Sequence, residues 1–229
     1  MAEVIKINDN TWRIEDEFVR FFLLCGTKKA VMIDSGVNCP EARKIAEELT
    51  NLPIMLLNTH GDGDHVSGTG AFEEIYMAAD DYNNCMLKDR FPNTTLVPVK
   101  DSDTFDLGNR TLEIIAIPGH TFGSIAILDV ENRILFSGDS VQDTHIYLFG
   151  DKRSPKGFSS ALNKLISISD RFDYIYPSHG TPILDSDYCD KVLESWNKVL
   201  DGKIEAKIIN LFGTDVKQFD GEFCGFYCD

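Results

Sequence analysis

Four of the five histidines in this chain lie in three short polar loops, and each loop follows a run of residues with the composition of a β-strand. The apolar run at residues 54–57 leads directly into the polar string 58–65, which holds two of them. Packing in a core does not explain such a placement. Rigid scaffolds carry catalytic residues on loops at strand ends, so the pattern predicts a strand-rich fold with a site on these loops. The histidines are His60, His65, His120 and His179.

Strand and helix patterns extend along the whole chain. β-branched and aromatic runs between turns predict an antiparallel meander at residues 3–7, 11–14, 19–24 and 30–33. Further strands are expected at 54–57, 75–78, 104–107, 111–117, 124–129, 133–136 and 174–176. Helices are expected after Pro40, near 67–70, and at 80–88, 158–168 and 185–200. Two runs of strands, each followed by helices, predict an α/β fold with two sheets packed face to face, helices outside, and residues 1–229 in one domain.

The charge balance limits the partners of the chain. Lys and Arg number 22 against 37 Asp and Glu, a formal net charge of −15, which repels phosphate backbones and anionic membranes. We therefore expect a small-molecule substrate and neither nucleic acid nor a membrane as partner, while a homodimer stays open. The start of the chain lacks the pattern of a signal peptide, and no apolar run approaches the ~20 residues of a membrane span.

The six cysteines are scattered along the chain, which indicates free thiols and, with the missing signal, a cytoplasmic protein. Cys224 and Cys228 leave two interpretations open. They form either a metal or redox pair or part of a packed apolar tail.

Three aspartates share the loops of the histidines: Asp62 and Asp64 in the first loop, and Asp139 in the string Phe-Ser-Gly-Asp-Ser. Imidazole and carboxylate together suit Zn²⁺, Fe or Mn²⁺. Seven ligands exceed the need of one ion, whereas two ions that share a bridging carboxylate use them all. The sequence therefore predicts two divalent metal ions, with the ligands His60, Asp62, Asp64, His65, His120, Asp139 and His179.

This order of residues resembles the motif of the metallo-β-lactamase superfamily, His-x-His-x-Asp-His followed by His, Asp and His, and the early Asp34-Ser-Gly also fits it. The resemblance covers nearly the whole chain and implies an αββα sandwich with the metals along one edge of the sheets. It implies that site one holds His60, Asp62 and His120, that site two holds Asp64, His65 and His179, and that Asp139 bridges them.

One ligand departs from the family pattern, because Asp62 stands where most hydrolases of the superfamily have histidine. The extra carboxylate lowers the Lewis acidity of site one and favours Fe or Mn, although zinc remains the first expectation. The flavodiiron proteins, a redox branch of the superfamily, have a glutamate at this position. Since aspartate is one methylene shorter, site one is expected to be the weaker of the two.

The resemblance and the ligand set together predict a dinuclear metallo-hydrolase of ester, thioester, lactone or related acyl bonds that uses a metal-bridging hydroxide. Asp64 and Asp139 are the first candidate catalytic residues. His145 and Tyr147 are further candidates, as a substrate contact or proton donor, because they lie in residues 143–149, which are expected to form a loop at the mouth of the site.

The main alternative is a non-haem di-iron redox protein that acts on O2, NO or peroxide with a separate electron donor, since no flavin site is visible. A nuclease conflicts with the net charge. A scaffold without catalysis conflicts with the nearly intact ligand set, and a true β-lactamase conflicts with the missing signal peptide and with Asp139. Residues 203–229 contain no recognisable pattern of basic residues that would hold glutathione, so a glutathione thioester is not supported as the substrate.

Overall fold

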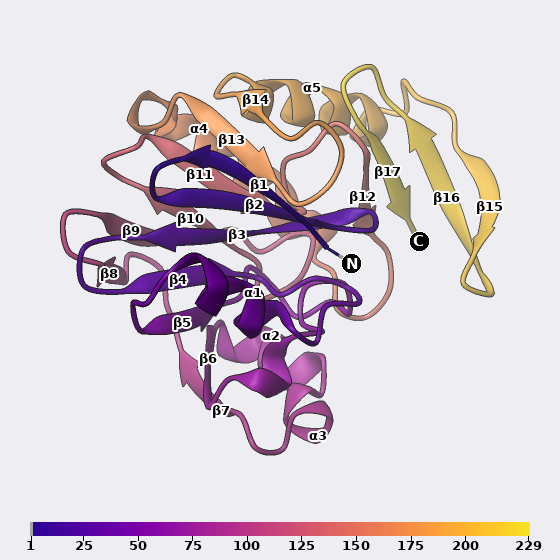
Figure 1. Cartoon of the computed structure of the whole chain (residues 1–229). Coiled ribbons are helices and arrows are strands. Elements are labelled where there is room, and N and C mark those ends of the chain that lie inside the picture. The colour runs from indigo at the N-terminus through magenta and orange to yellow at the C-terminus, as the bar shows by residue number, and fades with distance from the viewer. Residues whose placement is uncertain (1) are drawn as a thin grey trace.

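Two β-sheets form the centre of the computed structural model, which describes residues 2–229 and leaves Met1 outside (Figure 1). The first sheet has seven strands in sequence order: β1 (Glu3–Asn8), β2 (Thr11–Asp16), β3 (Val19–Cys25), β4 (Ala30–Ile33), β5 (Ile54–Leu57), β6 (Glu74–Met77) and β7 (Thr95–Pro98). The pairs from β1 to β4 are antiparallel and those from β4 to β7 are parallel. The predicted meander at the start of the chain is therefore confirmed.

The second sheet has six strands in the order β14-β13-β11-β10-β9-β8. Their bounds are β8 (Thr104–Asp106), β9 (Thr111–Ala116), β10 (Ile125–Asp129), β11 (Ile134–Gly138), β13 (Tyr174–Pro177) and β14 (Leu184–Asp185). The parallel pair β11 and β13 makes this sheet mixed as well. The sequence predicted all of these strands except the two-residue β14.

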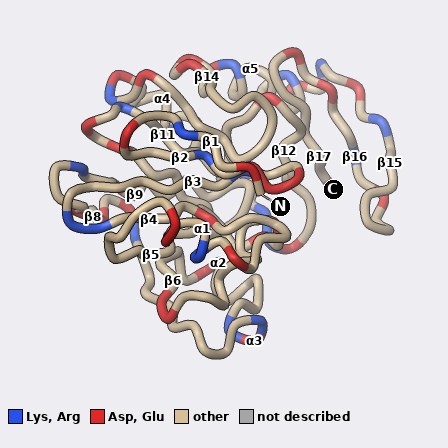
Figure 2. Tube along the Cα trace, viewed as in Figure 1, with Lys and Arg blue, Asp and Glu red and all other residues tan. Residues whose placement is uncertain are grey.

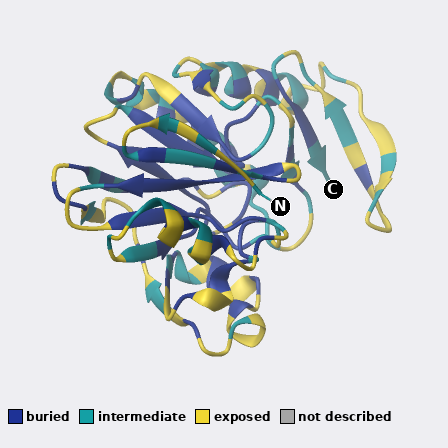
Figure 3. Ribbon diagram, in the orientation of Figure 1, coloured by how far each residue is buried: buried dark blue, intermediate teal, exposed yellow. Residues whose placement is uncertain are grey.

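Alternating side chains of the central strands explain why the sheets stack. In β3, Phe22 and Leu24 point into a core that they share with Ile114 of β9 and Ile127 of β10, whereas Phe21 lies in a separate core on the other face. A strand buried on both faces reads as a continuous apolar run, as β3 does (Figure 3). The shared core is the layer between the two sheets.

Helices cover the outer face of each sheet (Figure 1). The first sheet carries α1 (Ala42–Leu49), the short turn η1 (Thr69–Ala71), α2 (Ala79–Asn84) and α3 (Leu87–Arg90), and the second carries α4 (Pro155–Ser167), η2 (Ser169–Arg171) and α5 (Tyr188–Leu200). Phe158 of α4 and Trp196 of α5 pack in one cluster with Leu128 of β10. The layers are those of an αββα sandwich, as predicted, although 80–88 forms two short helices and 67–70 only a 3-10 turn.

A third sheet, which the sequence did not predict, stands beside the sandwich. Its order is β12-β17-β16-β15, with β12 (His145–Leu148), β15 (Lys207–Leu211), β16 (Thr214–Asp220) and β17 (Gly225–Cys228). Residues 143–149 were expected to form a loop. They form a strand because β17, some 80 residues further along, pairs with β12 in parallel, and local pattern carries no signal of such a partner.

The open question on the two tail cysteines has a structural answer. Cys224 is buried, and burial raises its pKa to about 12, while Cys228 packs against the same apolar cluster. Both thiols are free, which favours packing over a redox pair. Acidic and basic residues are interspersed along the chain (Figure 2). Within residues 2–229, no helix has the length and apolarity to cross a bilayer.

Candidate metal centre

The predicted ligands come from loops that leave both sheets at one end. His60 and His65 follow β5 of the first sheet, and His120, Asp139 and His179 follow β9, β11 and β13 of the second. Because the two sheets pack face to face, these strand ends meet at one edge of the sandwich. All seven predicted side chains lie there, in two groups of closely spaced ligand atoms.

The first group consists of His60, Asp62 and His120. The Nε2 atoms of the two histidines are 3.2 Å apart, and Asp62 Oδ2 lies 3.8 Å from His60 Nε2 and 3.3 Å from His120 Nε2. Ligand atoms at zinc bond lengths of about 2.0–2.1 Å lie roughly 3.3–3.5 Å from one another in a tetrahedral site. The spacing of this group therefore fits a metal ion.

The second group consists of Asp64, His65, Asp139 and His179. His179 Nε2 lies 3.4 Å from Asp64 Oδ2 and 3.2 Å from Asp139 Oδ2, while His65 Nε2 lies 3.3 Å from Asp139 Oδ1. Asp139 Oδ2 is also 3.6 Å from His120 Nε2 of the first group. Asp139 thus faces both groups, which is the arrangement that a bridging ligand requires.

Each histidine is oriented through its other nitrogen, as is usual for metal-binding imidazoles. The four Nδ1–H groups donate to oxygen atoms at 2.8–2.9 Å. The acceptors for His60, His65, His120 and His179 are Thr59 Oγ1, Asp34 Oδ2, the Tyr147 carbonyl and the Phe18 carbonyl, respectively. Every Nε2 atom is therefore turned toward the ligand groups. The hydrogen bond from His65 also explains the position of Asp34, which fits the family pattern in the sequence.

Two of the donor atoms lack partners of their own: His65 Nε2 and Asp139 Oδ1 are buried without a hydrogen bond from any residue in 2–229. The Nε2 atoms of His60 and His120 lie 3.2 Å apart, although His120 Nε2 also has Arg153 Nη1 at 3.2 Å. Buried polar atoms are normally paired, so a pair of bound cations fits this cluster.

The charges of the cluster compensate one another. Burial opposes the charged form of Asp139, but the neighbouring His179 and His65 outweigh it and hold its pKa well below the ordinary value. Burial likewise opposes charge on His179, yet Asp139 and Asp64 raise its pKa to about 10. For His60, burial and the nearby His65 lower the pKa well below its usual range. Protons thus balance the carboxylates, and a metal ion that binds here displaces them.

Two residues that contact the ligand loops were not predicted. Asp81 is buried and accepts hydrogen bonds from the backbone of Gly61 and Gly123 at 2.9 and 2.7 Å and from Thr121 Oγ1, so it ties the His60 loop to the His120 loop. Arg153 donates to Asp62 Oδ2 at 2.6 Å. Neither residue stands in a sequence motif. Both contact residues that are remote in the sequence, so only the folded structure reveals them.

A cavity of about 730 Å³ opens above the ligand groups. Its floor includes Asp62, Asp64 and Asp139, and its wall includes Tyr147, Tyr227 and Phe212. The predicted catalytic candidates His145 and Tyr147 both line it. His145 Nε2 lies 2.9 Å from Asp220 Oδ1, and its ring stacks on Tyr227 with centroids 4.6 Å apart, which makes it part of the wall.

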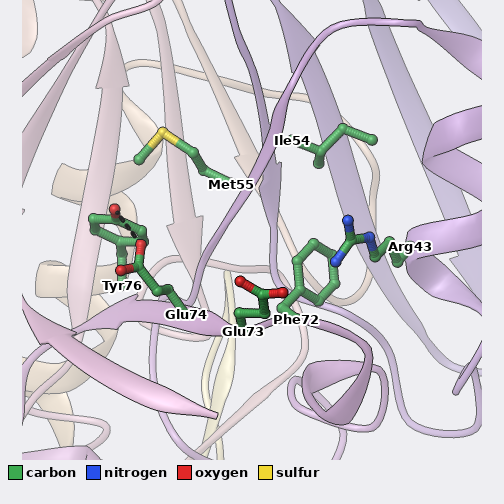
Figure 4. Close-up of a pocket in the computed structure, with 7 residues that line it drawn as sticks. All are labelled: Arg43, Ile54, Met55, Phe72, Glu73, Glu74 and Tyr76. Carbon is green, nitrogen blue, oxygen red and sulfur yellow. Dashed lines mark hydrogen bonds between the residues drawn. The ribbon is translucent and has the colours of Figure 1, made fainter.

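A smaller cavity of about 230 Å³ lies elsewhere, near α1 and β6, and Figure 4 shows the residues around it. It contains no histidine or cysteine among its described lining residues, and Tyr76 donates to Glu74 Oε2 at 2.9 Å across its edge. The ligand groups, with their buried donor atoms, are therefore associated with the larger cavity alone.

Comparison with known proteins agrees with this geometry. The sequence model of the metallo-beta-lactamase superfamily matches residues 15–206. This chain belongs to the metallo-β-lactamase superfamily. A solved relative, a metallo-beta-lactamase from Pontibacter korlensis, superposes with a TM-score of 0.71 at 21% identity, covering 86% of this chain and 99% of the other. The predicted fold is thereby confirmed.

Two curated members of the superfamily resemble the chain in sequence. A hydroxyacylglutathione hydrolase from Synechococcus sp. (strain JA-2-3B'a(2-13)) is 31% identical over 128 residues, which cover 56% of this chain and 50% of that protein. The acyl-coenzyme A thioesterase MBLAC2 of Homo sapiens is 23% identical over 220 residues, which cover 76% of this chain and 79% of the relative. This chain therefore spans only half the length of the first relative but most of the second.

Proposed function

We propose that the protein is a metal-dependent hydrolase of acyl bonds, with thioesters and esters as its first substrate class. The observation that carries this proposal is the position of Asp139 between two groups of ligand atoms at the floor of a cavity of about 730 Å³. The two curated relatives described above are a hydroxyacylglutathione hydrolase and an acyl-coenzyme A thioesterase by name. They support the thioester class.

The residues of the chain divide the work of such a reaction. Ions held by the two groups would supply Lewis acidity and would lower the pKa of water, which is the chemistry of dinuclear hydrolases. Asp139 and Asp64 lie at the floor of the cavity as ionised carboxylates, because both have lowered pKa values despite burial. Burial and the adjacent Tyr227 raise the pKa of Tyr147, so its phenol stays protonated at neutral pH. We assign Tyr147 the role of a substrate contact that donates a hydrogen bond, because so weak an acid does not protonate a thiolate leaving group.

The wall of the cavity suits an apolar acyl group. Phe18, Val37, Phe212 and the two tyrosines give it apolar and aromatic surface, and Arg153 is the one Lys or Arg among the described residues that line it. That guanidinium is already paired with Asp62. An anionic carrier such as glutathione or coenzyme A finds no free cation inside this cavity, so we propose that an apolar acyl portion, not the carrier, is bound there.

Elemental analysis of protein purified without added metal, followed by assay, tests the proposal. We expect zinc, with two ions per chain when zinc is in excess, and chelator-sensitive hydrolysis of thioesters or esters. Two iron ions with a charge-transfer band that reductant bleaches, and no hydrolysis, would instead support the di-iron redox function.

Replacing Phe212 tests the apolar wall. Phe212 is 87% exposed at the turn between β15 and β16 and has a positive φ of 54°, yet it lines the cavity. We expect Phe212→Ala to raise KM for long apolar acyl substrates by about five- to tenfold through lost apolar contact, with kcat nearly unchanged. Acetyl substrates, which have no long apolar chain, provide the internal comparison.

A matched control is Phe122→Ala, since Phe122 is also exposed, at 43%, but is absent from the lining of this cavity. It should leave KM unchanged for every chain length. Equal effects of the two substitutions would show that Phe212 does not contact substrate.

A further inference from the structure

A guanidinium lies directly against the first ligand group. Arg153 Nη2 donates to Asp62 Oδ2 at 2.6 Å, and Nη1 lies 3.2 Å from His120 Nε2 and 3.1 Å from the His120 carbonyl oxygen. The Arg153 side chain is only 13% exposed. Since His120 Nδ1–H already donates to the Tyr147 carbonyl, His120 Nε2 carries the lone pair, and Arg153 donates to it. Both contacts use the atoms that would bind a metal.

The backbone positions the residue that carries this guanidinium. Ser154 N–H donates to the Gly119 carbonyl at 2.8 Å, and Phe122 N–H donates to the Lys152 carbonyl at 3.1 Å. The segment that carries Arg153 is therefore hydrogen-bonded on both sides to the loop that carries His120. The guanidinium itself is held by its three contacts with Asp62 and His120.

The second group has no such cation. Among the described residues, no Lys or Arg pairs with Asp64 or Asp139, whose ion-pair partners are all histidines. His65 Nε2 and Asp139 Oδ1 have no hydrogen bond at all within residues 2–229. An ion can therefore enter this group by displacing protons from histidines, without displacing a Lys or Arg side chain.

We propose that Arg153 is a built-in competitor for metal at His60, Asp62 and His120, so that the two groups bind ions with unequal affinity. The proposal rests on the metal-binding role of both groups in the proposed function. Together, the Asp62 carboxylate and the Arg153 guanidinium are neutral, as a histidine would be. The pair removes the extra negative charge that would favour iron, but an ion must break two charge-assisted hydrogen bonds to enter.

Titration of the metal-free protein with Co²⁺ and with buffered Zn²⁺, read by visible absorption and by ions per chain, tests this without an activity assay. For the wild type we expect two separate binding events, the first at least roughly tenfold tighter than the second. For Arg153→Met we expect the second ion to bind at least roughly tenfold more tightly than in the wild type, because the competing charge is gone.

Two variants serve as controls. Arg153→Lys keeps the charge and should keep the two events apart, while Arg171→Met removes an arginine that pairs with Glu113 away from the ligand groups and should change neither event. Weaker second-ion binding in Arg153→Met would overturn the proposal and make Arg153 a support for Asp62. Two equal events in the wild type would overturn it without any variant.

The titration distinguishes a failure of the proposed hydrolase function from a failure of the proposed role of Arg153. A protein that binds no ion in either group fails the proposed function itself. Two equally tight ions together with chelator-sensitive hydrolysis would leave the function standing and reject only the role of Arg153.

Discussion

Asp139→Asn is expected to abolish hydrolysis and to reduce bound zinc to less than one ion per chain. The substitution keeps the shape of the side chain but removes the one carboxylate that faces both ligand groups. The low pKa of Asp139, held down by His179 and His65, means that the native side chain is fully ionised at neutral pH. Metal ions supply several kcal/mol of charge stabilisation, so we expect kcat/KM to fall by roughly a thousandfold or more.

Zinc content by elemental analysis and the hydrolysis rate should be measured on the same preparation. Asp173→Asn is the matched control, since Asp173 is an exposed aspartate that pairs with Arg133 and belongs to neither ligand group. It should leave both quantities unchanged. Wild-type turnover in Asp139→Asn would reject the dinuclear centre.

The largest effect on stability is expected for Arg110→Met. Arg110 is 1% exposed and donates to Asp129 Oδ2 through Nε at 2.9 Å, to the Asn10 carbonyl at 2.8 Å and to Thr11 Oγ1 at 3.0 Å. It thereby joins the second sheet to the first. The substitution leaves Asp129 buried with its charge unpaired by arginine, which costs about 3–5 kcal/mol of the free energy of unfolding and lowers Tm by roughly 6–20 °C.

Thermal and urea unfolding followed by circular dichroism check this expectation. Arg133→Met breaks an ion pair with Asp173 whose side chains are 44% and 57% exposed, and it should cost less than about 1 kcal/mol. The double variant Arg110→Met, Asp129→Leu should recover part of the loss, because it removes the orphaned charge. A small effect of Arg110→Met alone would show that water reaches Asp129.

The sequence revealed the sandwich and the ligand cluster because each depends on local signals. The strands at 19–24 and 111–117 show as short apolar or alternating runs, and they become β3 and β9 within a few residues. His60, Asp62, Asp64 and His65 stand in one loop, so their order in the chain already predicts their proximity.

Other features could not be predicted from the sequence because they depend on partners that are remote in the chain. His145 and Tyr147 belong to β12, which is a strand only because β17 pairs with it. Arg153 stands in no motif, and the contact that places it beside the ligands is with Asp62, 91 positions earlier in the chain. Asp81 likewise acts through Gly61 and Thr121. No periodicity or motif encodes contacts of this kind.

The metal ligands and part of the cavity wall come from different parts of the chain, because the third sheet supplies the wall but no ligand. The candidate metal ligands lie between His60 and His179, whereas one side of the cavity wall is formed by the segment that contains Phe212 and Tyr227. That segment contributes none of the ligand atoms. Under the proposed function, mutation there is expected to alter which acyl group is accepted while the ligand atoms stay unchanged, so substrate preference can diverge independently of the metal chemistry.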